Sequence, residues 1–463
     1  MVNVYLKGHD NYYGIADILR LFGSPVREDR ENGLVSCSMD TDIELISEID
    51  KHGYTYAYIK GEIPRRTELP PVVPKRSVKR DLYILMCKIT GTSFPWGCLT
   101  GIRPTLVAAE EGDPASLTQK YLVREDKAAL AWQTSVEESR ILNTHGEESL
   151  NIYIGIPFCP SRCEYCSFIS NDAVKHMKLL RPYAEAVIKE ISMVAPYIRR
   201  PVASVYLGGG TPTVFDDGTF GYLIGNISSL LHIGGDTEFT VEAGRPDTIN
   251  AQKLKSMKAA GATRICINPQ TMNSETLGKL GRKHTSEDTV RAYEEARAAG
   301  FDTVNMDLIA GLKYEDDTDF TESLEKILKL DPEDITIHTL YKKRRALMGR
   351  GDVLSRERGD TDRAVSDGYR MLYAHGYHPY YLYRQKDTGH GLENTGFTSG
   401  EGCYYNVAMM SDRRDVLSFG AGGMSKRIFE EGRLERCPCI KDVTGYIASC
   451  EEMAGRKIGF FDL

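Results

Sequence analysis

The sequence Asn151-Ile-Tyr-Ile-Gly-Ile-Pro-Phe158 runs directly into Cys159-Pro-Ser-Arg-Cys163-Glu-Tyr-Cys166. The first part is apolar and rich in β-branched residues, as in a buried strand, and the second has the spacing C-x₃-C-x₂-C. Three thiolates so close together can bind three irons of a [4Fe–4S] cluster, which leaves the fourth iron free to bind a small molecule. A zinc knuckle or reduced core cysteines are the alternatives. Zinc sites usually have four ligands in paired C-x₂-C units, and no second pair lies nearby. The spacing therefore predicts one [4Fe–4S] cluster on Cys159, Cys163 and Cys166.

Short apolar runs recur regularly after residue 150, and the intervals between them are long enough for helices. The runs cover about residues 152–156, 203–207, 237–241, 264–267, 303–306 and 335–337. The helices are expected at Tyr183–Val194, Phe220–Leu231, Ala251–Ala260, Thr289–Ala299 and Phe320–Leu330. Repeated strand–helix units predict a parallel sheet with right-handed crossovers.

Polar residues and glycines follow four of these expected strands. They are Gly208-Gly-Gly-Thr-Pro-Thr213, Glu242, Gln270 and Asp307. In parallel barrels, functional groups gather at the carboxyl ends of the strands. The glycine run is either a tight turn or a place where a ligand approaches the backbone closely, because glycine has no β-carbon. The four strand ends together predict a ligand site.

The first 60 residues are typical of a small α/β domain. Val2–Leu6 and Tyr54–Ile59 are expected to be strands, and Ile15–Phe22 and Ile43–Lys51 helices. The proline-rich stretch Glu62–Lys75 is expected to be an extended linker.

Helical patterns follow at about 77–90 and 115–143. Between them lies the turn-rich segment Pro95–Pro104, whose Trp96 and Arg103 belong either to a binding loop or to a packed loop with a buried tryptophan. After about residue 350, helices are expected at Arg363–Ala374 and Asp442–Met453. We expect four regions, at 1–75, 76–147, 148–350 and 351–463.

Composition excludes several classes of protein. The formal net charge of −7 argues against general binding to nucleic acid or to an anionic membrane. No apolar run approaches the roughly 20 residues that span a bilayer, and the N-terminus has no signal-peptide pattern. Eleven cysteines spread over 463 residues indicate a reducing cytoplasm rather than a disulfide framework. Because a cluster with an open iron is sensitive to oxygen, we expect the protein to function under anaerobic conditions.

Several segments together resemble one enzyme family. They are Tyr153-Ile-Gly-Ile-Pro-Phe-Cys159, Gly208–Thr213, Val241-Glu-Ala243, Asn268-Pro-Gln270, Leu280-Gly-Arg282 and Met306-Asp-Leu-Ile309. The chain is similar to the oxygen-independent coproporphyrinogen III dehydrogenase family of the radical S-adenosylmethionine (SAM) superfamily. Pro95-Trp-Gly97, Thr100–Thr105 and Tyr381–Lys386 are similar to its HemZ branch. The resemblance implies an α/β fold: a radical SAM partial (β/α)₆ barrel with an N-terminal α/β domain and a C-terminal α+β cap.

The resemblance also implies cofactors and the residues that bind them. One [4Fe–4S] cluster would work with one or two SAM molecules, and no protein side chain is assigned a catalytic role beyond the cofactor. The implied cofactor-binding residues are Tyr153, Tyr165, Gly209, Gly210, Thr211, Glu242, Gln270, Arg282, Asp307 and Met424. Carboxylates suit ribose hydroxyls or an ammonium group, and arginine suits a carboxylate. The alternative for Arg282 is a surface charge at a helix end.

The implied reaction is the oxidative decarboxylation of two propionates of coproporphyrinogen III to vinyl groups, which gives protoporphyrinogen IX. Arg103, Arg384 and Lys386 are candidate partners of the propionates, as are Arg344 and Arg345, for which a solvated charged face is the alternative. The expected partners are a tetrapyrrole and an electron donor such as flavodoxin or ferredoxin.

Two other functions stay open. One is a haem-binding chaperone, and the other is a radical SAM enzyme that acts on haem itself. Phe168 stands where the founding enzymes carry a further cysteine, and the related chaperones also have an aromatic residue there.

Overall fold

The computed structural model describes residues 1–166, 171–340, 360–385 and 391–463. These residues form two compact units. The first unit consists of Met1–Val136 and Leu382–Asn394, and the second of Glu137–Tyr381 and Thr395–Leu463. The division into four regions stays a prediction.

The first unit begins with an α/β domain. Its elements are β1 (Val2–Lys7), α1 (Tyr12–Phe22), β2 (Val26–Asp29), β3 (Leu34–Cys37), β4 (Ile43–Ile49), β5 (Thr55–Ile59) and α2 (Pro74–Thr90). The strands form one sheet in the order β2-β3-β1-β4-β5, with β1 parallel to β4 and antiparallel to β3. The helix α1 packs on β2 and β3, and α2 packs on β4 and β5. The small α/β domain expected from the sequence is confirmed.

The helix expected at Ile43–Lys51 is wrong, because this segment is the strand β4. Its apolar residues have a helix-like spacing, but Leu45, Ile46 and Ser47 are all buried. The strand pairs with β1 on one side and with β5 on the other. Pairing with strands on both edges stabilises β4 more than the local helical preference of this segment would stabilise a helix. Such preferences are weak for short apolar runs.

Three further helices follow in the N-terminal half of the chain. They are α3 (Pro104–Glu111), α4 (Pro114–Tyr121) and α5 (Glu125–Leu142). The single helical pattern expected over 115–143 is therefore two helices. They are separated at Leu122, whose backbone adopts a left-handed conformation with φ of 60°. The helix α3 begins at Pro104, the last residue of the turn-rich segment. Trp96, near the start of that segment, is completely buried.

The second unit is built on a sheet whose middle is parallel. Its central strands are β6 (Leu150–Ile156), β9 (Val202–Gly209), β10 (Glu238–Glu242), β11 (Arg264–Cys266), β12 (Thr303–Ala310) and β13 (Asp334–Thr339). Each is parallel to the next in this order. These strands confirm the repeated strand–helix units predicted from the apolar runs.

Flanking strands extend this sheet on both sides. They are β14 (His378–Arg384), β15 (Glu393–Thr398), β16 (Asp415–Phe419), β17 (Met424–Ile428) and β18 (Leu434–Pro438). The order is β14-β15-β13-β12-β11-β10-β9-β6-β16-β17-β18. The strand β15 is antiparallel to β13, whereas β16 is parallel to β6. A separate pair is formed by β7 (Phe158–Cys159) and β8 (Asn171–Asp172).

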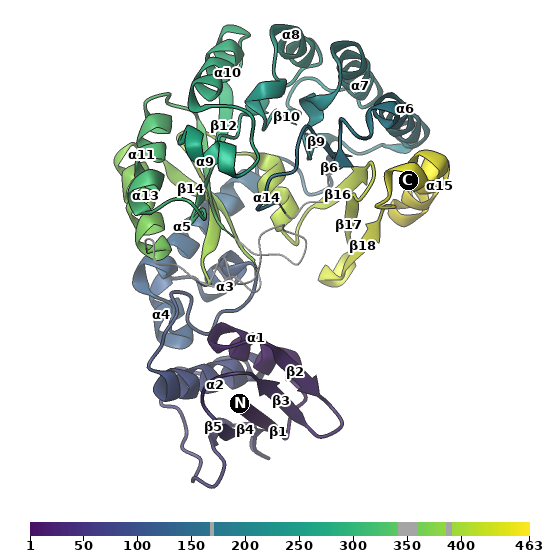
Figure 1. Cartoon of the computed structure of the whole chain (residues 1–463). Helices are drawn as coiled ribbons and strands as arrows, with labels where there is room; N and C mark the ends of the chain where they lie inside the picture. Colours follow the sequence, from purple (N-terminus) through teal and green to yellow (C-terminus); the bar gives the residue numbers. More distant parts are fainter. Residues whose placement is uncertain (167–170, 341–359, 386–390) are drawn as a thin grey trace. The chain divides into compact units, whose positions relative to one another are not determined.

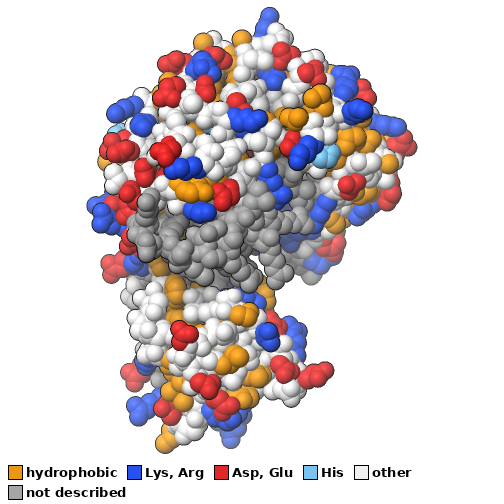
Figure 2. All heavy atoms as spheres, viewed as in Figure 1, with side chains coloured by type: hydrophobic (Ala, Val, Ile, Leu, Met, Phe, Trp, Pro, Cys, Tyr) orange, Lys and Arg blue, Asp and Glu red, His pale blue; other side chains and the backbone are white. Residues whose placement is uncertain are grey.

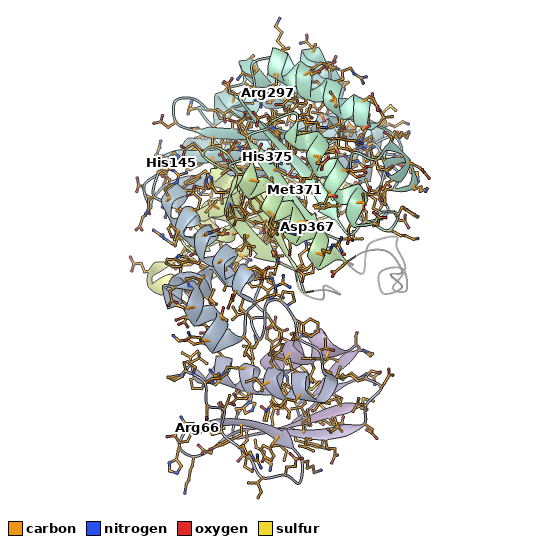
Figure 3. The ribbon with its side chains drawn as sticks, turned by 90° about the vertical axis from the view of Figure 1, so that its left-hand side faces the viewer. Arg66, His145, Arg297, Asp367, Met371 and His375 are labelled. Atoms are coloured by element: carbon orange, nitrogen blue, oxygen red, sulfur yellow. The ribbon has the colours of Figure 1, made fainter. Side chains whose placement is uncertain are left out.

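Helices of the second unit lie on both faces of the curved parallel sheet, most of them on its outer face (Figure 1). They are α6 (Met177–Val194), α7 (Asp217–Leu230), α8 (Ala251–Ala259), α9 (Ser274–Lys279), α10 (Ser286–Ala298), α11 (Asp317–Leu328), α13 (Thr361–Ala374), α14 (Tyr404–Met410) and α15 (Val443–Phe461). Neighbours in sequence pack together, α6 with α7 and α7 with α8, while α13 packs on α11. Asp367, Met371 and His375 follow one another at one-turn spacing along α13 (Figure 3).

The C-terminal helix α15 is fastened to α6 by a buried network around Glu190. The Glu190 carboxylate accepts hydrogen bonds from the Tyr446 hydroxyl (2.6 Å) and the Gly420 N–H (3.1 Å). It also forms an ion pair with Lys457 of α15. The side chains of Glu190 and Lys457 are at most 2% exposed. The network therefore holds the glycine-rich loop at Gly420 against the second unit's core.

Charged side chains of both signs are interspersed over the described part of the face shown in Figure 2. No helix in the described ranges is long and apolar enough to cross a membrane.

Candidate functional site

Five side chains from five strands or the segments next to them meet at the carboxyl ends of the parallel strands. Tyr153 on β6 and Tyr206 on β9 are direct neighbours in the strand register, and Glu242 is the last residue of β10. Asp307 on β12 and His338 on β13 form a pair, with His338 Nε2 3.4 Å from Asp307 Oδ2. We call these five residues the mouth cluster. It is at the edge of the sheet where the sequence predicts a ligand site.

Glu242 is held by two donors from β9. Its Oε1 accepts the Tyr206 hydroxyl at 2.6 Å, and its Oε2 accepts the Gly209 N–H at 2.9 Å. Burial raises the pKa of Glu242 to about 7, helped by the charge of Asp307, whereas the two hydrogen bonds and His338 oppose this shift. Glu242 is therefore a carboxyl group that changes its charge near neutral pH.

Three tyrosine rings are stacked beside Glu242. The Tyr206 and Tyr405 centroids are 4.6 Å apart with an interplanar angle of 26°. Tyr153 stacks on both rings, at 6.3 Å from Tyr206 and 6.1 Å from Tyr405. Burial raises the pKa of each of these tyrosines, so the hydroxyls are neutral donors at neutral pH. The stack forms a rigid aromatic wall next to the carboxylate.

Asp307 has contacts on both carboxylate oxygens. Oδ1 accepts the Asn305 Nδ2 at 2.8 Å, and Oδ2 faces His338. The backbone of Gln270 is joined to β12, because its N–H bonds to the Asp307 carbonyl and its carbonyl accepts the Ile309 N–H, both at 2.9 Å. Gln270 has a φ of 71°, a left-handed conformation that is uncommon for a residue other than glycine. Such strained residues cluster at functional sites.

The three cysteines of the predicted cluster site lie in one loop after β6. Cys163 is buried, and Cys159 and Cys166 are half-buried. The Thr211 hydroxyl lies 3.5 Å from the Cys159 sulfur, and Arg245 Nη1 lies 3.9 Å from the Cys163 sulfur. Donors directed at sulfur suit thiolates that carry negative charge.

The chemistry of this donor set fits an iron–sulfur cluster. None of the three cysteines, all of which the structure describes, forms a disulfide. Within the described residues, however, no three histidine, cysteine, aspartate or glutamate side chains are grouped closely enough to hold a metal ion. Phe168, two residues beyond the third cysteine, lies outside the described residues.

The glycine run joins β9 to the cysteine loop. The N–H of Gly210 donates to the Ile156 carbonyl, and the N–H of Thr211 donates to the Phe158 carbonyl, both at 2.7 Å. A β-carbon on Gly210 would lie 2.4 Å from the Phe158 carbonyl oxygen. Position 210 therefore needs glycine because the protein's own backbone approaches it closely. From the sequence alone, the close approach of a ligand was expected instead.

Arg282 and Tyr165 contact each other beside the cysteine loop. Arg282 Nη1 donates to the Tyr165 hydroxyl at 3.0 Å, and Nη2 donates to the carbonyls of Gly244 (2.6 Å) and Asn268 (2.7 Å). Arg282 is 6% exposed, and its Nε has no hydrogen-bond partner among the residues that the structure describes. The structure therefore places Arg282 inside the site rather than at a helix surface. Its role in binding SAM stays a prediction.

Met424 begins β17, directly after the glycine-rich loop that approaches β6. A β-carbon on Gly420 would lie 2.4 Å from the Gly155 carbonyl oxygen, so the loop abuts the strand that leads to the cysteines. The structure thus brings the region of Met424 to the end of β6.

Two of the candidate substrate residues, Arg103 and Arg384, belong to the described part of the first unit. Arg384 is buried and donates to the carbonyl oxygens of Gly391 (2.7 Å) and Leu99, and its guanidinium lies 5.4 Å from the centre of the Trp96 ring. These partners favour a structural role for Arg384 over direct contact with a propionate. Arg103 is half-buried at the start of α3. Lys386, Arg344 and Arg345 lie outside the described residues.

Three residues of this region escaped the sequence analysis: Tyr206, His338 and Arg245. The sequence did hold a signal for Tyr206 and His338. Alternate residues of a strand lie on the same face of the sheet, so polar residues that alternate with apolar ones along a buried strand mark one face. No comparable signal marked Arg245, which contacts the cysteine loop across 82 residues of sequence.

Comparison with known proteins was informative. Residues 153–327 match the radical SAM superfamily. The chain is 31% identical over 462 residues to the oxygen-independent coproporphyrinogen-III oxidase-like protein HemZ of Bacillus subtilis, covering 95% of this chain and 92% of that protein. It is 27% identical over 301 residues to the haem chaperone HemW of Escherichia coli, covering 64% of this chain and 75% of that protein.

Among solved structures, the fold is similar to that of coproporphyrinogen III oxidase (HemN) from Escherichia coli, with a TM-score of 0.54 and 20% sequence identity. The superposition covers 69% of this chain and 73% of HemN. At this level of identity, the likeness concerns the fold.

Proposed function

We propose that this chain, which belongs to the HemZ family of oxygen-independent coproporphyrinogen-III oxidase-like radical SAM proteins, is an oxidoreductase that converts propionates of coproporphyrinogen III to vinyl groups. The observation that carries the proposal is the extent of the HemZ match, 95% of the chain, compared with 64% for the HemW chaperone. Radical SAM membership implies a [4Fe–4S] cluster and SAM. The use of two SAM molecules is part of the proposal.

The bound cluster and SAM would supply a radical that removes a hydrogen atom from the β-carbon of a propionate. The protein's own residues then have three tasks: to hold the irons, to bind SAM and to exclude water. Cys159, Cys163 and Cys166 hold the irons. Glu242 and Asp307 accept hydrogen bonds from polar groups of SAM, because both carboxylates lie in the mouth cluster and Glu242 is already oriented by Tyr206.

The tyrosine stack supports the same proposal by shielding this edge of the sheet from water. Tyr405 is only 5% exposed, and its ring covers that of Tyr206. Exclusion of water prevents side reactions of a reactive intermediate and strengthens the electrostatic interactions of the nearby carboxylates. Formation of each vinyl group removes two electrons, one with the hydrogen atom and one that passes to an acceptor as CO₂ leaves.

We further propose a flavodoxin- or ferredoxin-type electron donor and a reducing, cytoplasmic setting. None of the eleven cysteines, all of which lie in the described ranges, forms a disulfide, which supports a reducing compartment.

The test is an anaerobic assay of the protein reconstituted with iron and sulfide. Coproporphyrinogen III, SAM and a reductant are added, and 5′-deoxyadenosine, CO₂ and vinyl products are measured. We expect SAM cleavage to rise with the substrate and mono- and divinyl products to appear. A Cys163→Ala protein treated in the same way serves as the inactive control.

A haem chaperone is the second candidate, favoured by the similarity to HemW. A chaperone binds haem tightly and releases no CO₂. Tight haem binding without any vinyl product in the same assay would therefore replace the enzyme assignment.

A further inference from the structure

Arg245 lies against the cysteine loop and is only 3% exposed. Its Nη1 lies 3.9 Å from the Cys163 sulfur and 3.5 Å from the Ser161 carbonyl oxygen. Its Nη2 donates to the Ser161 hydroxyl at 3.1 Å. One guanidinium therefore contacts both a predicted iron ligand and the backbone beside it.

A second pair of residues fixes the orientation of this guanidinium. Asp247 meets Arg245 with two contacts, Oδ1 at 3.2 Å from Nε and Oδ2 at 3.4 Å from Nη2. His284, which is 2% exposed, lies behind Asp247 with its Nδ1 3.7 Å from Oδ1. Burial acts to raise the pKa of Asp247, but the contacts with His284 and Arg245 outweigh it and hold this pKa below its ordinary value. Asp247 therefore stays ionised beside Arg245.

The chemistry of arginine explains why this residue type suits the position. A guanidinium is planar and always charged, and it presents several N–H groups in fixed directions, so it can serve Asp247, Ser161 and Cys163 together. Removal of such a cation from water is costly unless anionic partners are close. Asp247 is one such partner, and a thiolate bound to iron is the second.

We propose that Arg245 is a positioning residue that donates a hydrogen bond to the Cys163 sulfur and thereby raises the reduction potential of the cluster. The inference rests on the cluster of the proposed function. Reduction adds one negative charge to the cluster, and a fixed donor and cation at one of its sulfurs stabilise the reduced state more than the oxidised state. Hydrogen bonds to sulfur are among the factors that set the potentials of iron–sulfur clusters.

A purely structural role for Arg245 has a different signature. The Ser161 hydroxyl donates to the Gly281 carbonyl at 2.8 Å, so Ser161 ties the loop to the following segment as well as to Arg245. If Arg245 acts only by holding the loop through Ser161, then Ser161→Ala should reproduce its effect. If it acts on the sulfur, then only substitution of Arg245 should shift the potential.

The experiment compares wild-type protein, Arg245→Gln, Arg245→Lys and Ser161→Ala after anaerobic reconstitution. Iron and sulfide content are measured first, and the cluster is then titrated with a reductant and followed by electron paramagnetic resonance. We expect near-normal iron content in Arg245→Gln and a ratio of reduced to oxidised cluster about tenfold lower at a fixed potential. This corresponds to about 59 mV for a one-electron couple. We expect a smaller shift in Arg245→Lys and none in Ser161→Ala.

The outcomes separate the two proposals. A wild-type protein that takes up no cluster contradicts the proposed function itself. A loaded cluster whose potential is the same in Arg245→Gln as in the wild type overturns the role of Arg245 alone, as does an equal shift in Ser161→Ala. Loss of the cluster from both Arg245 variants also overturns the tuning role and leaves Arg245 as a residue that holds the loop.

Discussion

The hydroxyl of Tyr206 donates to Oε1 of Glu242 at 2.6 Å and so joins the aromatic stack to the carboxylate of the mouth cluster. The two residues come from neighbouring parallel strands. The bond therefore fixes the direction of the Glu242 carboxylate before any ligand arrives, which lowers the conformational cost of binding.

Substitution of Glu242 or Asp307 by alanine should weaken SAM binding about ten- to hundredfold. A hydrogen bond between a charged carboxylate and a ligand contributes about 1.5–3 kcal/mol. Affinity is measured by anaerobic calorimetry on cluster-loaded protein. Tyr206→Phe is the matched control, because it removes only the hydroxyl that orients Glu242, and its loss should be smaller. Unchanged affinity in both alanine variants would show that these carboxylates are structural.

Each of Cys159→Ala, Cys163→Ala and Cys166→Ala should abolish the visible absorption of the reconstituted cluster and the reductive cleavage of SAM, because three thiolates are needed to hold three irons. Cys437→Ala is the control. Cys437 is buried, as Cys163 is, but it lies on β18, and its substitution should leave both properties intact. Wild-type protein that binds only zinc under these conditions would refute the cluster.

Gly210→Ala should prevent assembly of the cysteine loop and lower cluster content. The added β-carbon would lie 2.4 Å from one backbone oxygen and 2.8 Å from another, and backbone atoms cannot move away as a flexible side chain can. Overpacking of this kind costs about 1–3 kcal/mol. Gly225→Ala on α7 is the control, because its β-carbon would enter open space. Equal cluster content in the two variants would contradict the steric argument.

Lys127→Met should destabilise the first unit by about 3–5 kcal/mol, because it removes the ammonium group that pairs with a buried carboxylate. Lys127 Nζ lies 2.6 Å from Glu393 Oε1, and the side chains are 1% and 0% exposed. Glu393 also accepts the Trp96 indole N–H at 2.7 Å. Both tryptophans of the chain lie in the first unit, so tryptophan fluorescence during urea unfolding reports on this unit.

The double variant Lys127→Met/Glu393→Gln tests the cause of this loss. The amide introduced at position 393 carries no charge, but its oxygen can still accept the hydrogen bond from the Trp96 indole N–H. We expect it to recover much of the lost free energy of unfolding. A double variant as unstable as Lys127→Met would point to lost packing instead.

The contributions of Glu242 and Glu315 to the free energy of unfolding should fall as the pH rises from about 4.5 to about 7. Burial raises the pKa of both Glu242 and Glu315 to about 7, from an ordinary value of 4.5. The folded state therefore binds more protons than the unfolded state in this window, and each group's contribution is complete below pH 4.5 and lost through pH 7. For each group, the loss is at most about 3 kcal/mol. The free energy of unfolding is measured at several pH values.

Glu315→Gln should remove its part of this pH dependence without touching the mouth cluster, since Glu315 bonds to Thr271 instead. Asp247 acts in the opposite direction, because its lowered pKa contributes stability that disappears only at acidic pH. Equal pH dependence of the free energy of unfolding in the wild type and in Glu315→Gln between pH 4.5 and 7 would contradict the raised pKa of Glu315.

The sequence predicted the parallel strands well because they are largely buried, which leaves short apolar runs such as Val205-Tyr-Leu207. It failed at β4, where pairing with two neighbouring strands decides the structure. The cysteine loop could be recognised from spacing alone. Arg245 could not, because its significance lies in a contact between segments far apart in the chain, and such a contact exists only after folding.

The first unit is completed by Leu382–Asn394, a segment that carries both Arg384 and Glu393. A gene fragment that ends at Val136 would therefore deprive the Trp96 indole N–H and the Lys127 ammonium of their shared acceptor. Such a fragment cannot reproduce the native interior of the unit. Any recombinant dissection of the protein, and any exchange of this unit between homologues, must transfer two separate stretches of coding sequence together.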